Sequence, residues 1–70
     1  MNDLYTYQIE LRGQLNENDI NAMSPFQMTI VRANTASTYA TVYTDQSGLI
    51  GLIRHLHGKG FVLLSIIREQ

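Results

Sequence analysis

Residues 44–66, "TDQSGLIGLIRHLHGKGFVLLSI", decide the fold expected of this chain. Four apolar residues recur at the spacing of one helical face: Leu49, Leu52, Ile53 and Leu56. Asp45 precedes them as an N-cap and Gly60 follows as a left-handed stop, so we expect a helix that runs to about Gly58. The segment "FVLLSIIR" (61–68) is then a strand that is apolar on both faces.

Upstream, the chain alternates between strand and helix signals. "YTYQIELR" (5–12) has period two and predicts a half-buried strand. "NENDINAM" (16–23) predicts a short helix capped by Asn16 and stopped by Ser24 and Pro25. "FQMTIVRA" (26–33) and "TYATVYT" (38–44) predict a hairpin with a turn at 34–37.

The predicted order is β-α-β-β-α-β in one α+β domain covering residues 1–70. It favours a four-stranded antiparallel sheet with its helices on one face, in the ferredoxin-like arrangement. If residues 16–23 form only a turn, the alternative is a three-stranded meander with a helical crossover to the fourth strand. Both arrangements keep the long helix on the sheet.

Composition narrows the classes of protein. The 70 residues include no cysteine, which excludes disulfides and thiolate metal sites, and the net charge of −1 lacks the basic footprint of a nucleic-acid binder. No apolar stretch approaches the ~18 residues of a membrane span, and no secretory signal is recognisable at the N-terminus. We therefore expect a cytoplasmic protein. Because chains this short rarely build a sufficient core, we also expect a homo-oligomer.

Surplus apolar surface indicates where copies would meet. The last strand is apolar on both faces, and Val31 and Val42 add apolar surface to the middle strands. Gly48, Gly51 and Gly58 gather with His55 on the helix arc opposite the core, either as a smooth docking face or because two of these glycines only mark helix ends. The candidate interface residues are Val31, Val42, Val62, Leu64, Ile66, Gly51 and His55.

No chemical motif emerges. His55 and His57 are two residues apart on a helix and point in different directions, so they cannot chelate one metal as an i, i+4 pair would. Lys59 lies between two glycines but follows a helix C-terminus, whereas phosphate loops precede helix N-termini. The sequence therefore predicts no catalytic residue, no cofactor and no metal.

The C-terminal half resembles a group of short, uncharacterised bacterial proteins. The shared features are an aspartate-glutamine pair, a leucine-rich helix with an internal glycine, and a glycine followed by a leucine-rich strand with a serine. In this chain they are Asp45, Gln46, Leu49, Gly51, Leu52, Gly60, Leu63, Leu64 and Ser65. "YQIELRGQL" is similar too, whereas residues 16–30 and 55–59 depart from the group. The resemblance implies a stand-alone cytoplasmic domain and assigns no activity.

Three functions compete. The first is a non-catalytic, self-associating domain that binds a protein or small molecule. The second is a small dimeric enzyme or ligand sensor with a pocket lined by His55, Tyr7, Tyr39 or Arg54. The third is weak nucleic-acid binding through sheet tyrosines, although "STYATVYT" lacks the basic and glycine residues of an RNA-binding strand.

Overall fold

The computed structural model describes residues 3–22 and 26–69. The elements are β1 (Tyr5–Arg12), α1 (Glu17–Ala22), β2 (Thr29–Ala33), β3 (Ser37–Thr44), α2 (Gln46–Gly58) and β4 (Leu63–Glu69). The predicted helix residue Met23 and the predicted stop at Ser24 and Pro25 lie outside the described residues.

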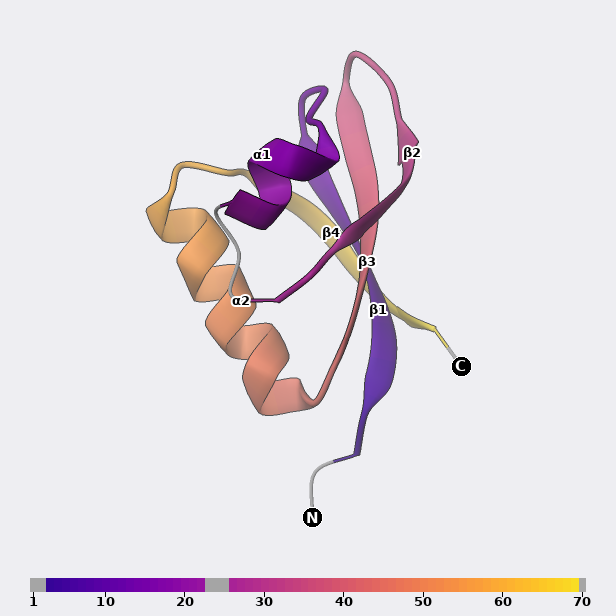
Figure 1. Cartoon of the computed structure of the whole chain (residues 1–70), viewed down its shortest axis with the longest axis vertical. Helices are drawn as coiled ribbons and strands as arrows, with labels where there is room; N and C mark the ends of the chain where they lie inside the picture. The colour runs from indigo at the N-terminus through magenta and orange to yellow at the C-terminus, as the bar shows by residue number, and fades with distance from the viewer. Residues whose placement is uncertain (1–2, 23–25, 70) are drawn as a thin grey trace.

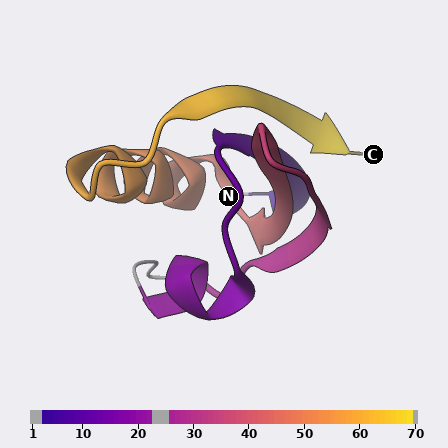
Figure 2. The same ribbon diagram turned by 90° about the horizontal axis from the view of Figure 1, so that it is seen from above.

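The four strands form one antiparallel sheet in the order β2-β3-β1-β4. Both helices lie on the same side of this sheet (Figures 1 and 2). The predicted α+β architecture with a four-stranded antiparallel sheet is confirmed. The meander alternative is wrong because β1 pairs with β3 and β4, not with β2. The ferredoxin-like assignment stays a prediction.

The long helix begins and ends where local signals place it. The Asp45 side chain accepts a hydrogen bond from the Gly48 amide at 2.7 Å, which satisfies a free donor of the first turn. At the other end, Gly60 has φ +92° and turns the chain toward β4. The short helix α1 is capped in the same way, since Asn16 Oδ1 accepts from the Asp19 amide at 2.8 Å.

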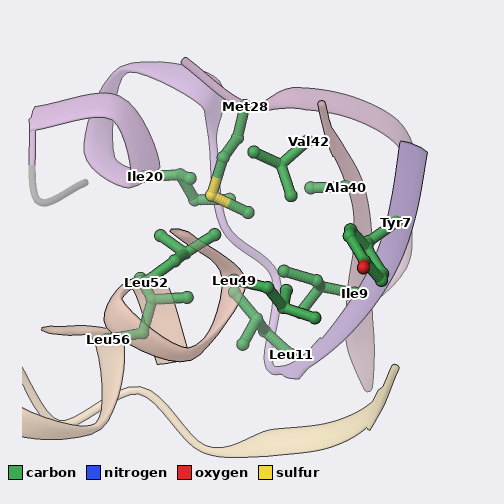
Figure 3. Close-up of a cluster of buried hydrophobic side chains, with 10 residues drawn as sticks. All are labelled: Tyr7, Ile9, Leu11, Ile20, Met28, Ala40, Val42, Leu49, Leu52 and Leu56. Carbon is green, nitrogen blue, oxygen red and sulfur yellow. The ribbon is translucent and has the colours of Figure 1, made fainter. Parts of the chain in front are cut away.

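The core lies between the two helices and one face of the sheet (Figure 3). β1, α1, β3 and α2 contribute buried residues to one apolar cluster, and Met28 joins it just before β2. Its members are Tyr7, Ile9, Leu11, Ile20, Met28, Ala40, Val42, Leu49, Leu52 and Leu56. Leu63 and Ile66 of β4 pack against the cluster while remaining partly exposed.

Both edge strands contain a β-bulge. Ile30 pairs with Ala40 and Arg32 with Tyr39, so Val31 is the extra residue of β2. In β4 the pairing moves from Leu63 to Ser65, which leaves Leu64 as the extra residue. A bulge reverses which side chains face the core beyond it. The extra residues Val31 and Leu64 are themselves exposed.

Candidate interaction surface

Two of the predicted interface residues face the core. Val42 is only 2% exposed because it shares the inward face of β3 with Ala40. Ile66 pairs with Ile9 and packs against the core because the bulge at Leu64 shifts the alternation of β4. Placing Val42 and Ile66 on an outward surface was therefore wrong.

The other predicted residues keep access to solvent. Val31, Val62 and Leu64 are exposed, as is Gly51 in the middle of α2, and His55 is half-buried. They do not form one continuous face, because Val31 lies on β2 at the opposite edge of the sheet from Val62 and Leu64.

Four residues with polar side chains cross the outward face of the sheet, and we name them the polar row: Arg32, Tyr39, Glu10 and Ser65. Glu10 of β1 lies opposite Tyr39 of β3 and Ser65 of β4, and Tyr39 lies opposite Arg32 of β2. The Ser65 hydroxyl donates to Glu10 Oε1 and the Tyr39 hydroxyl to Glu10 Oε2, each at 3.0 Å. Arg32 stacks over the Tyr39 ring, with Cζ 4.2 Å from its centroid. The expectation of an apolar outward face is thus wrong along this row.

Electrostatics of the row centre on the Glu10 carboxylate. The Ser65 hydroxyl, followed by the Tyr39 hydroxyl, lowers the pKa of Glu10, and Ser37 and the positive charge of Arg32 act in the same direction. Partial desolvation opposes them without reversing the shift. Hydrogen bonds to the charged form favour ionisation, so Glu10 is an anion that the row holds in place.

The two edges of the sheet differ in what covers them. At β2, the Ile30 amide donates to Glu17 Oε2 at 3.3 Å, and the Met28 amide just before the strand donates to Asn21 Oδ1 at 2.7 Å. Side chains of α1 therefore occupy backbone donors at the β2 edge. Among the described residues, none donates to or accepts from the open edge of β4. β4 is the unprotected edge of the sheet.

β4 and the loop before it also carry exposed apolar side chains. Val62 is 43%, Leu64 42% and Ile67 55% exposed. Ile67 pairs with Gln8 and faces outward, beside the end of the polar row. Sequence reasoning missed Ile67 as an exposed residue, because only the bulge at Leu64 places it on the outward face.

A cavity of about 390 Å³ lies between the C-terminal end of α2 and the start of β4. We name it the α2–β4 pocket. Its walls are apolar apart from one imidazole and one glycine: Ile53, Leu56, His57, Gly60, Phe61, Val62 and Leu63.

The residues proposed for an enzyme pocket are not brought together. Tyr7 is buried in the core, whereas Tyr39 lies on the outward face of the sheet. Tyr5 and Tyr7 likewise face the helices while Tyr39 faces outward, so the tyrosines do not form one stacking platform. In the described part of the chain, no three His, Asp or Glu side chains converge to hold a metal ion.

No protein family, curated protein or solved structure matches the chain. The resemblance to short bacterial proteins therefore stays a prediction. Within residues 3–22 and 26–69, no helix has the length and apolar character needed to cross a membrane.

Proposed function

We propose that this chain is a non-catalytic binding domain that associates with a second copy of itself through the open edge of β4. The observation that carries the proposal is the difference between the two sheet edges. α1 covers backbone donors at the β2 edge, whereas no residue within 3–22 or 26–69 pairs with the outer side of β4, which carries exposed Leu64 and Ile67. An exposed apolar edge strand pairs readily with another strand.

The sequence of β4 is compatible with pairing to itself. In a two-fold antiparallel arrangement centred on Ile67, this residue lies opposite its own copy, and Ser65 lies opposite Glu69. All three belong to the outward face, so like faces meet. Arg68 lies opposite Ile66, which keeps the two arginines away from a direct like-charge contact.

The apolar contribution of Ile67 follows from its exposure. Complete burial of an isoleucine contributes about 1.5–3 kcal/mol, and Ile67 is 55% exposed, so covering the remainder contributes about 0.8–1.6 kcal/mol per copy. Two copies together contribute about 1.6–3 kcal/mol, or roughly 15–150-fold in the dimer dissociation constant. Backbone hydrogen bonds between the two β4 edges stabilise the dimer in addition to this apolar contribution.

Sedimentation velocity over a series of protein concentrations tests the proposal with a matched pair of variants. Ile67→Lys places a charge at the proposed contact and should yield monomers where the unaltered chain is dimeric. Val31→Lys is the control, because Val31 is also β-branched, lies on the other edge strand and is 54% exposed. A chain that stays monomeric at all concentrations, or equal loss of dimer in both variants, would contradict the proposal.

We also propose the ferredoxin-like fold and a cytoplasmic, bacterial setting for the domain. The strand order read from β4 is β4-β1-β3-β2, and this supports the fold because each β-α-β unit is then split by a third strand. The cytoplasmic setting is supported by the lack of cysteine, since the fold needs no oxidising compartment. The bacterial setting depends on the resemblance described above.

A further inference from the structure

The α2–β4 pocket has the size and lining of a small-molecule site. Its volume of about 390 Å³ lies toward the lower end of the ~300–1,000 Å³ typical of ligand pockets, which suits a single ring or a short branched chain. Leu56 belongs to the buried core, and Ile53, Phe61 and Leu63 belong to its partly buried margin. The cavity is therefore a recess of the core that opens to solvent.

The backbone keeps this recess open. Gly60 adopts φ +92°, a left-handed conformation that turns the chain away from the helix axis before Phe61. The Phe61 amide then donates to the Leu56 carbonyl at 3.0 Å, which ties the loop to the last turn of α2. Because this loop is fixed by hydrogen bonds, the cavity is preformed.

The segment that lines the pocket carries no negative side chain. Residues 53–63 contain Arg54 and Lys59 and no carboxylate. His57 lines the pocket, and Lys59 is the chain neighbour of the lining residue Gly60. A cation beside an apolar cavity attracts an anion and raises its local concentration.

The dipole of α2 disfavours an anion at the helix C-terminus, and hydrogen bonds at this end weaken that effect. Carbonyl oxygens at a helix C-terminus repel anions when they lack donors. Here the His55 and Leu56 carbonyls accept from the Lys59 amide, and the His57 carbonyl accepts from the Gly60 amide, each at 3.1 Å. With these donors in place, the last carbonyls of α2 repel an anion less than free carbonyls would.

We propose that the α2–β4 pocket binds a small monocarboxylic acid with an apolar body. The ring or branched chain fills the cavity between Ile53 and Phe61, and the carboxylate lies at the rim near His57 and Lys59. This site does not depend on the proposed self-association, because none of these residues lies in the paired segment 65–69.

The test is a titration of the full chain with 4-phenylbutyrate, followed by two-dimensional ¹H–¹⁵N NMR. The neutral amide of the same shape, 4-phenylbutyramide, is the matched ligand. We expect saturable shifts concentrated at residues 53–63, with the acid binding more tightly than the amide. Shifts without saturation, shifts centred on the polar row, or equal affinity for acid and amide would overturn the proposal.

Two charge variants locate the carboxylate. Lys59→Gln should weaken binding of the acid about two- to five-fold, as expected for one solvent-exposed ion pair, and leave the amide unchanged. Arg32→Gln removes the same charge from β2 and should affect neither ligand. Loss of affinity for both ligands in Lys59→Gln would contradict the assigned role of the charge.

Repeating the titration with Ile67→Lys separates this site from self-association. Binding should persist in this variant whatever its oligomeric state. If the unaltered chain is monomeric and still binds the acid, the association proposal fails and the pocket stands. If the dimer forms and no acid binds, the pocket fails alone.

Discussion

Two glycines of α2 provide the sharpest test of the packing, because one helix holds them in opposite surroundings. A methyl group added at Gly51 would meet nothing within 4 Å beyond its chain neighbours and the surrounding backbone of its own helix. A methyl group added at Gly48 would overlap Thr44 Oγ1 and approach the Phe26 ring at 3.0 Å and Asp45 Oδ1 at 3.2 Å. Gly48→Ala and Gly51→Ala should therefore change stability in opposite directions.

The expected magnitudes follow from these surroundings. Alanine is favoured over glycine inside a helix by about 0.5–1 kcal/mol, so Gly51→Ala should raise the free energy of unfolding by that amount. For a domain of this size the gain corresponds to a rise of about 2–8 °C in Tm. At Gly48 the same preference is opposed by overpacking, which costs about 1–3 kcal/mol. Thr44 is buried, so its hydroxyl has little room to rotate away, and we expect a net loss of about 1–2 kcal/mol.

Urea unfolding followed by circular dichroism measures both changes, and thermal melts give the matching Tm values. The measurements belong at a protein concentration where sedimentation shows one species, because association also stabilises a fold. If Gly48→Ala stabilised as much as Gly51→Ala, the close packing of Phe26 and Thr44 would be refuted. If Gly51→Ala destabilised the chain, its face of α2 would be covered in solution, as a docking face between helices requires.

Two further substitutions probe polar groups. Thr38 is fully buried; its hydroxyl donates to the Gly13 carbonyl at 2.8 Å and accepts from the Leu15 amide at 2.9 Å. Thr38→Val should therefore lower the free energy of unfolding, measured in urea, by about 1–3 kcal/mol. A change near zero would contradict these two hydrogen bonds. Glu10→Gln should flatten the acid limb of a stability–pH profile. Because the folded-state pKa lies below the ordinary 4.5, the ionised form stabilises the fold above 4.5, and this contribution is lost as pH falls through the lowered pKa. An identical acid limb in the variant would refute the bonded state of Glu10.

Local signals in the sequence predict the central elements well. The bounds of β1 agree with the alternating segment 5–12, and the Asp45 cap and the Gly60 stop delimit α2 as expected. Each of these signals acts within a few residues, so the chain need not be folded for it to be recognised.

The edge strands are less predictable, because their details depend on pairing between distant segments. The predicted strands 26–33 and 61–68 are observed as Thr29–Ala33 and Leu63–Glu69. The bulges at Val31 and Leu64 set which side chains face out, and no local pattern announces them. The bulge at Leu64 is why Ile66 is predicted outward and Ile67 is missed. Val42 faces inward for another reason, because it alternates with Ala40 along β3 and pairs with the buried Tyr7.

In the candidate site, too, local signals predict some features, and contacts between distant segments decide the others. His57 and Lys59 were recognised as helix-end residues, but the pocket exists only when β4 returns beside α2. Gly48 was grouped with the open glycines because Phe26, which fills the space beside it, lies far away in the chain. Glu10 gave no signal, since its hydrogen-bond partners come from two other strands.

The position of β1 in the sheet has a consequence for how the protein folds. β1 lies between β3 and β4, and its pairing with β4 joins Thr6 to Glu69, almost the full span of the chain. Such distant pairing closes the largest loops, and this slows folding relative to a helical chain of equal length. Cleavage just before β4 would remove the whole partner strand on one side of β1, so we expect it to unfold the domain rather than to leave a shorter folded one.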